Sequence, residues 1–245
     1  MNDRITLDYG SGGLKTSELI DSVLLPAFDN PLLTELGDGA VLADTGGSGL
    51  VFSTDSFVVT PWRFPGGDIG KLSVCGTVND LCMAGGTPRY LSLSFILEEG
   101  FLFSDLRQIV TSIAEEAKKA GVSIVTGDTK VVDSGKGDGI YINTAGIGFQ
   151  RVDLPGKAAI RPGDDVIVSG TVGCHGAAVM MARSGLISEE SPLRSDCMTL
   201  HRISAAALDA AAVNDGAEPG SVRILRDPTR GGVATTLTGF TEGMS

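Results

Sequence analysis

The order of strand-like and helix-like segments between residues 40 and 149 most constrains the fold of this 245-residue chain. Residues 104–121 give the clearest helix signal, because apolar side chains recur there at helical spacing and Gly121 follows the last turn. A second helix is predicted over residues 68–86, with Asp68 as its N-cap and a glycine pair at its end. The predicted strands are residues 40–44, 49–59, 90–99, 123–127 and 138–149. The resulting order, β-β-α-β-α-β-β, indicates an α/β or α+β domain.

A domain boundary is predicted near residues 151–163, where two prolines and alternating charges interrupt this pattern. The elements expected beyond it are a strand at 165–170, a helix at 175–185, an alanine-rich helix near 195–213 and one helix start after residue 231. A single strand cannot easily bury both faces of a sheet, so we interpret this region as an incomplete domain. We therefore place an N-terminal domain at residues 1–153 and a C-terminal α/β domain at residues 154–245.

Charge and hydropathy exclude several classes of function. The net charge of −11 argues against a nucleic-acid partner, because such binding depends on lysine and arginine beside phosphates. A nucleotide substrate stays open, since Mg²⁺ held by carboxylates can bridge an acidic protein to phosphates. No apolar run is long enough for a membrane span, and the start MNDRITLDYG has neither the basic nor the apolar region of a signal peptide. The four cysteines form no CxxC pair, so we expect reduced thiols in a cytoplasmic protein.

Aspartates recur at the junctions of the predicted strands and helices: Asp38, Asp55, Asp80, Asp128 and Asp227. Asp80 is the most informative, because an ionised carboxylate in an apolar helix is costly unless it is paired or binds metal. Each aspartate taken alone is better explained as a cap of a turn or helix. The whole set, with no comparable cluster of glutamate or histidine, favours a site for Mg²⁺ and phosphate.

The segment GDTK at residues 127–130 follows a predicted strand with a carboxylate, a hydroxyl and an ammonium group. Lys130 could bind a phosphate while Asp128 accepts a hydrogen bond or binds metal. A polar hairpin turn explains these four residues equally well. The segment is not a Walker A loop, and the chain has no GxGxxG dinucleotide fingerprint.

Taken in order, these segments resemble the superfamily of ATP-dependent enzymes that includes aminoimidazole ribonucleotide synthetase, selenophosphate synthetase and thiamine-monophosphate kinase. Within that superfamily the chain is most similar to the HypE family of hydrogenase maturation factors. The motifs that carry the resemblance are YGSGG (9–13), FSTDSFVV (52–59), FPGGDIGKLSVCGTVNDL (64–81), PRYLSLSFILEEG (88–100), IVTGDTKVV (124–132), INTAGIG (142–148) and DPTRGGV (227–233). They span nearly the whole chain, and their combination is specific.

The resemblance implies two α/β domains, the first of which has a mixed sheet that pairs with that of a second subunit to close a barrel in a homodimer. ATP and Mg²⁺ would bind in a cleft near that interface. The implied ligands of metal or phosphate are Asp38, Asp55, Asp80 and Asp227, and Asp80, Asp128 and Lys130 would act in catalysis. The implied nucleotide-binding residues are Lys71, Asn79, Gly127, Thr129, Arg230, Gly231 and Gly232.

The resemblance also implies an activity, that of an ATP-dependent carbamoyl dehydratase. Such proteins receive a carbamoyl group on a C-terminal cysteine from the carbamoyltransferase HypF. They use ATP to dehydrate the thiocarboxamide to a thiocyanate, and the cyano group passes to a HypC–HypD scaffold for the iron of [NiFe]-hydrogenase. Two alternatives stay open, namely a non-catalytic module that dimerises and binds partners, and another enzyme of the superfamily that phosphorylates a small molecule.

Two departures from the family pattern bear on this expectation. Cys174 stands where related sequences usually carry an aspartate before the histidine, so the role of that aspartate is vacant or unneeded. Related sequences also continue further and end in the cysteine that is carbamoylated, whereas the last cysteine here is Cys197. We therefore interpret the chain as C-terminally truncated, with the dimerising, nucleotide-binding part kept and the reaction not completed.

The sequence thus predicts that these 245 residues do not accept a carbamoyl group. After incubation with the carbamoyltransferase, carbamoyl phosphate and ATP, intact-mass spectrometry should show an unmodified chain. A stable carbamoyl or cyano adduct on any of the four cysteines would contradict the prediction.

Overall fold

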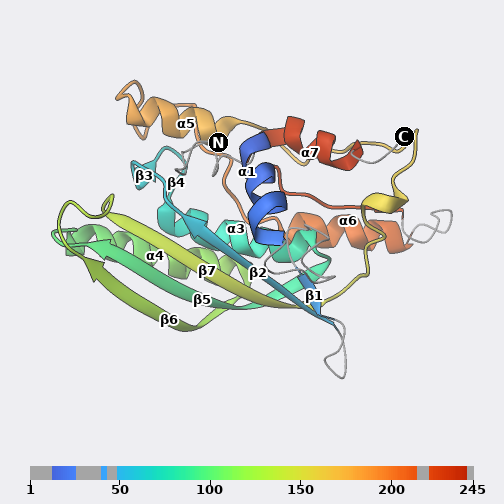
Figure 1. Cartoon of the computed structure of the whole chain (residues 1–245), viewed down its shortest axis with the longest axis horizontal. Helices are drawn as coiled ribbons and strands as arrows, with labels where there is room; N and C mark the ends of the chain where they lie inside the picture. The colour runs from blue at the N-terminus through green and yellow to red at the C-terminus, as the bar shows by residue number, and fades with distance from the viewer. Residues whose placement is uncertain (1–12, 26–39, 43–48, 214–220, 242–245) are drawn as a thin grey trace.

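The computed structural model describes residues 13–25, 40–42, 49–213 and 221–241. Its N-terminal part is built on a five-stranded sheet in the order β1-β2-β7-β5-β6 (Figure 1). The strands are β1 (Ala40–Leu42), β2 (Leu50–Phe57), β5 (Gly86–Glu98), β6 (Ser123–Val132) and β7 (Ile140–Gln150). β5 and β6 pair in parallel and the other neighbours pair antiparallel, so the predicted mixed sheet is confirmed. A two-stranded ribbon, β3 (Arg63–Phe64) with β4 (Gly67–Asp68), precedes the first long helix.

Two helices, α3 (Ile69–Met83) and α4 (Phe103–Ala120), pack together on one face of this sheet (Figure 1). α3 is buried on nearly all sides, because it contacts three strands of the five-stranded sheet, the short strand β4, α4 and a helix of the second region. α4 has one apolar stripe, and Ile109 and Ile113 of that stripe are fully buried against α3. Both helices match the predicted ranges closely. Asp68 caps α3 as predicted, since its Oδ1 accepts a hydrogen bond from the backbone N–H of Lys71 at 2.9 Å.

The second region contains helices and no strand among its described residues. Its elements are η3 (Lys157–Ala159), α5 (Cys174–Arg183), α6 (His201–Val213) and α7 (Gly232–Thr241). The predicted strand at residues 165–170 is therefore wrong for the described chain: these residues form no ladder, and Ile167 is 89% exposed. A strand needs a neighbouring strand to satisfy its backbone groups, and none is present there. Two short helical elements, α1 (Leu14–Leu19) and η2 (Ile20–Leu24), come before the first strand of the sheet in the chain.

The predicted helix near 195–213 begins later than expected, at His201. Residues 195–200 form neither helix nor strand and are bonded to the N-terminal part of the chain. The backbone N–H of Ser195 donates to the carbonyl of Pro65 at 2.7 Å, and that of Leu200 donates to the side chain of Asn79 at 2.7 Å. Because their backbone groups bond outside the segment, these residues do not join the helix. No helix in the described ranges has both the length and the apolar character needed to cross a membrane.

The packing of α4 predicts a large stability difference between two neighbouring positions. Ile113 is 1% exposed, so Ile113→Ala should lower the free energy of unfolding by about 2–5 kcal/mol. Val110 lies on the same helix but is 43% exposed, so Val110→Ala should change it by less than about 0.5 kcal/mol. Urea denaturation of both variants measures the difference, and equal losses would contradict this packing.

Candidate functional site

Asp55 and Asp80 lie on facing elements, β2 and the last turn of α3. The Asp55 carboxylate points at the helix, where a β-carbon added to Gly76 would lie 3.1 Å from its Oδ2. Burial raises the pKa of Asp55, against the hydrogen bond from the backbone N–H of Ser56 and the charge of Arg230, which both lower it. Asp80 accepts a hydrogen bond from the buried Ser53 hydroxyl at 2.7 Å. Both aspartates thus lie where α3 packs on β2, and their role as ligands of metal or phosphate stays a prediction.

Asn79 joins α3 to the second region. Its Nδ2 donates to the carbonyl of Met198 at 3.1 Å, while its Oδ1 accepts from the backbone N–H of Leu200 at 2.7 Å. The Asn79 side chain also hydrogen-bonds Asp227. Asn79 therefore carries a structural role in addition to the nucleotide-binding role that the resemblance implies.

Asp227 lies close enough to Asp55 for the two carboxylates to interact electrostatically. Burial raises the pKa of Asp227, and the negative charges of Asp55 and Asp196 add to that effect. The hydrogen bond from Asn79 and the charge of Arg226 act in the opposite direction. Carboxylates that are partly desolvated and close enough to repel each other are stabilised by a cation placed between them.

Asp196 is a residue of this region that the sequence did not single out. Its carboxylate caps α5, because Oδ1 accepts from the backbone N–H of His175 at 2.9 Å and Oδ2 from that of Cys174 at 3.2 Å. A side chain at position 174 is therefore not needed to cap this helix, which bears on the departure seen at Cys174. No local sequence signal could have found this cap, since the capping residue lies in another segment.

The DPTRGG segment begins α7 with two glycines in the left-handed region. Gly231 has φ 71° and Gly232 has φ 63°, conformations that other residues adopt only with strain. A β-carbon at Gly231 would also meet the Thr235 hydroxyl at 2.1 Å. Arg230 is exposed, and its charge reaches Asp55. Arg230 and Asp227, which belong to the same turn, thus both interact electrostatically with Asp55.

Asp128 and Lys130 lie apart from these aspartates. Their segment is part of β6, so the alternative of a hairpin turn is wrong: β6 is an edge strand paired with β5. The two side chains form an ion pair at 2.6 Å, and this hydrogen bond holds the pKa of Asp128 below its ordinary value. They pair with Ser94 and Ile96, on the sheet face opposite α3 and α4. Strands β7 and β5 separate them from β2, which carries Asp55.

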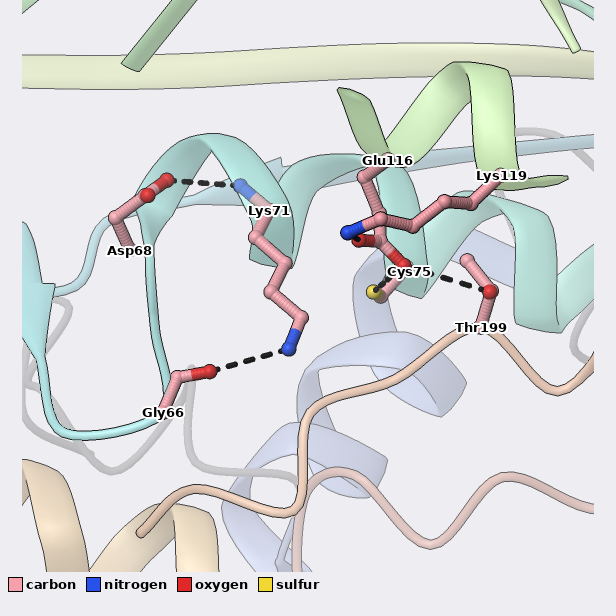
Figure 2. A network of polar contacts seen from close by, with 7 residues as sticks. All are labelled: Gly66, Asp68, Lys71, Cys75, Glu116, Lys119 and Thr199. Atoms are coloured by element: carbon pink, nitrogen blue, oxygen red, sulfur yellow. Dashed lines mark hydrogen bonds and ion pairs between the residues drawn. The ribbon is translucent and has the colours of Figure 1, made fainter. Parts of the chain in front are cut away.

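The neighbouring positions in β6 and α3 have local roles. Gly127 lies so close to β5 that a β-carbon would meet the Leu93 carbonyl oxygen at 2.2 Å, which explains the glycine without a nucleotide. Thr129 alternates with Asp128 and so lies on the other face of β6. Lys71 donates from its Nζ to the carbonyl of Gly66 at 3.1 Å, within the β3–β4 turn (Figure 2). Asp38 lies outside the described residues.

Two family descriptions match consecutive parts of the chain. The AIR synthase related protein, N-terminal domain, matches residues 36–150, and its C-terminal domain matches residues 161–241. Carbamoyl dehydratase HypE of Escherichia coli is 45% identical over 243 residues, which cover 97% of this chain and 69% of that protein. The chain belongs to the HypE family.

Other HypE relatives agree in sequence and in structure. Carbamoyl dehydratase HypE of Cupriavidus necator is 50% identical over 235 residues, 96% of this chain and 64% of that protein. The crystal structure of a HypE–HypF complex matches with a TM-score of 0.81 at 46% identity, over 91% of this chain and 69% of that one. HypE in complex with ATP matches with a TM-score of 0.72 at 46% identity, over 97% and 68%. This chain thus spans about two thirds of the length of its HypE relatives, as the 64% coverage of the first of these illustrates.

The HypE-type aspartates form only part of a metal site in the described ranges. No group of three or more histidine, cysteine, aspartate or glutamate side chains there is close enough to hold a metal ion. Asp55 and Asp227 supply two hard oxygen donors of the kind that Mg²⁺ prefers, in a setting where a cation would relieve their repulsion. The residues present are therefore compatible with Mg²⁺ and do not by themselves complete its coordination.

The raised pKa of Asp227 predicts a specific pH dependence of stability. The folded state takes up a proton at Asp227 at higher pH than the unfolded chain does, so stability from this group falls as the pH rises from about 4 through the folded pKa. Asp227→Asn removes that loss and keeps an amide beside Asn79. The variant should gain stability relative to the wild type as the pH rises from 4 to 7, as measured by urea denaturation.

The matched control is Asp165→Asn, because Asp165 is exposed. Its stability should run parallel to the wild type at every pH. If the Asp227→Asn curve also ran parallel, the carboxylate would not be desolvated as the structure indicates.

Proposed function

We propose that this chain forms the nucleotide- and metal-binding part of a HypE-type carbamoyl dehydratase. The observation that carries the proposal is the convergence of Asp55, Asp80 and Asp227 on the helix α3, together with Asn79. These residues come from both parts of the chain, and Asn79 holds the two parts together. A HypE relative with 46% identity has been crystallised with ATP, which supports ATP as the nucleotide.

The proposed reaction asks the protein mainly for positioned charge. ATP would phosphorylate the oxygen of a thiocarboxamide, so that this oxygen leaves as phosphate and a thiocyanate remains. Phosphoryl transfer of this kind is accelerated by groups that hold the phosphates and neutralise the developing charge. Arg230, whose charge acts on Asp55, and Lys71, beside the β3–β4 turn, are the cationic groups that the family resemblance assigns to the nucleotide.

Mg²⁺ is proposed as the second cofactor, with Asp55 and Asp227 as its ligands. Asp80 and Asp38 complete the set that the family resemblance implies. Bound there, Mg²⁺ would neutralise phosphate charge. Its presence would also favour the ionised form of both carboxylates, against the burial that now raises the pKa of each.

A homodimer is proposed from the open face of the sheet. The face opposite α3 and α4 presents apolar side chains of β2, β5 and β7 that are 39–45% exposed: Phe52, Tyr90, Ile96, Ile147 and Phe149. Phe52, Tyr90 and Ile147 are direct neighbours across the ladder. Contiguous exposed apolar residues on a sheet are typical of an interaction surface. Asp128 and Lys130 lie on this same face, so a second subunit would be brought toward them, and Lys130 would then contribute to a site at the interface.

The partners follow the family resemblance. A HypE relative forms a complex with HypF, which supports a HypF-type carbamoyltransferase as a partner of this chain. Delivery of the cyano group to a HypC–HypD scaffold is proposed from the resemblance alone. We place the protein in the cytoplasm, and the four free cysteines agree with a reducing compartment.

Nucleotide binding tests the proposed site directly. The wild type should bind ATP in the presence of Mg²⁺, and Asp80→Ala should weaken binding about tenfold or more, because a carboxylate at the helix–sheet junction is lost. Asp165→Ala serves as the control, since Asp165 is exposed in the second region, and should bind as the wild type does. Isothermal titration with ATP, with and without Mg²⁺, measures both.

The outcomes also separate the alternatives. If the wild type bound no ATP, a non-catalytic module would be the better description. If it bound ATP and phosphorylated thiamine monophosphate, another activity of the superfamily would replace the HypE-type reaction. A solved structure of thiamine monophosphate kinase from Aquifex aeolicus, at 19% identity and a TM-score of 0.57, shares only the fold with this chain.

The dimer is tested by a charge on the open face. Ile147→Lys should convert the dimer to a monomer, because a lysine ammonium would be buried between the two sheets. Met180→Lys is the matched control, since Met180 is a 69% exposed apolar residue on α5. Size-exclusion chromatography with light scattering distinguishes the species, and a wild-type chain that is monomeric at high concentration would contradict the proposal.

A further inference from the structure

Two thiols meet at the junction between α3 and residues 195–200. Cys75 is 2% exposed on α3, and the neighbouring Cys197 thiol together with burial raises the pKa of its thiol. The Cys75 thiol and the Thr199 hydroxyl bond the same oxygen of Glu116, which places the segment of Cys197 beside Cys75. Cys197 is only partly buried. The two residues come from the two parts of the chain, so their contact crosses the junction between those parts.

The backbone on both sides of this contact is held in place. Asn79, one turn along α3 from Cys75, bonds the carbonyl of Met198 and the N–H of Leu200. On the other side of Cys197, the backbone N–H of Ser195 is bonded to Pro65. The segment that carries Cys197 therefore runs beside the part of α3 that carries Cys75, and it is fixed on both sides of Cys197.

A buried carboxylate lies at the same place. Glu116 of α4 is 5% exposed, and its Oε1 accepts from the Cys75 thiol at 3.9 Å and from the Thr199 hydroxyl at 3.5 Å (Figure 2). Its Oε2 bonds the Lys119 ammonium at 3.1 Å. As the acceptor of the Cys75 S–H bond, this carboxylate is placed to take that proton.

The other two cysteines, Cys82 and Cys174, have different neighbours. Cys82, also buried on α3, is hydrogen-bonded to Ser204, and burial raises its pKa to about 11. Cys174 begins α5, where Asp196 accepts from its backbone N–H. Cys75 and Cys197 differ from these two cysteines in three ways. They are neighbours, Glu116 can accept the proton of Cys75, and Cys197 is partly exposed.

We propose that Cys75 and Cys197 form a reversible disulfide when the protein meets a hydroperoxide, and that this bond ties α3 to residues 195–200. The sulfur of Cys197, the more accessible of the two, attacks the peroxide oxygen, forms a sulfenic acid and releases water. Cys75 passes its proton to Glu116 and attacks the sulfenic sulfur, which releases a second water as the S–S bond forms. The sum is two thiols and one hydrogen peroxide giving one disulfide and two waters.

The bond would act on the neighbouring residue Asp196. This carboxylate caps α5, and its negative charge acts on Asp227. A disulfide at the adjacent Cys197 would hold Asp196 in both of these interactions. The inference rests on the contacts of Cys75, Cys197 and Glu116, and it does not depend on the proposed dehydratase function.

Peptide mapping of the wild-type chain tests the pairing. After treatment with hydrogen peroxide and blocking of free thiols, mass spectrometry of the digest should show a Cys75–Cys197 linked peptide that disappears on treatment with dithiothreitol. The oxidised protein should melt about 5–15 °C above the reduced one, because the bond closes a long loop. A digest with both cysteines free, singly oxidised or linked to Cys174 would overturn the proposal.

Variants separate the roles of the groups. Cys75→Ser and Cys197→Ser should each abolish the rise in melting temperature, whereas Cys82→Ser and Cys174→Ser should keep it. Glu116→Gln should slow formation of the disulfide about tenfold or more, because the proton acceptor is lost. An unchanged rate in Glu116→Gln, or a lasting rise in Cys75→Ser, would contradict the mechanism; circular dichroism of each reduced variant confirms that it folds.

Discussion

The arrangement of the whole molecule depends on one amide side chain. Asn79 projects from a helix that is buried on nearly all sides, and it satisfies a carbonyl and an N–H of the second region as well as the Asp227 carboxylate. Hydrogen bonds from a rigid, buried donor and acceptor specify position, because a small displacement would leave the polar groups unpaired. Position 79 therefore determines where residues 195–200 and the DPTRGG turn lie relative to the sheet.

The acidic region follows from this anchoring. Asp55 reaches it from β2, Asp227 from the turn before α7, and Asp196 from the segment that Asn79 holds. Burial and mutual repulsion make the ionised state of these groups costly, while Arg226 and Arg230 offset only part of that cost. Positive charge placed in this region would offset the rest of that cost, which is the physical basis for proposing a divalent cation there.

The elements that were predictable from the sequence are those whose signal is local. The periodic apolar positions of α3 and α4 and the Asp68 cap are properties of neighbouring residues, and the structure confirms them. Residues 165–170 have the composition of a strand, yet they form none, because a strand requires a partner that composition does not reveal. The start of α6 at His201 and the cap by Asp196 both arise from contacts between distant segments. In the same way, Gly127 was assigned to a nucleotide, whereas its closeness to Leu93 is visible only once β5 and β6 are paired.

The sequence separation of the Asn79 contacts has a consequence for the order of folding. Its bonds to Met198 and Leu200 join residues that are 119 and 121 positions apart. Such contacts contribute only after a large loop has closed, so they cannot guide the early steps of folding. We therefore expect α3 and the N-terminal sheet to form before residues 195–200 pack against them. During synthesis on the ribosome α3 also emerges before residues 195–200, so the order of emergence agrees with this expected order of folding.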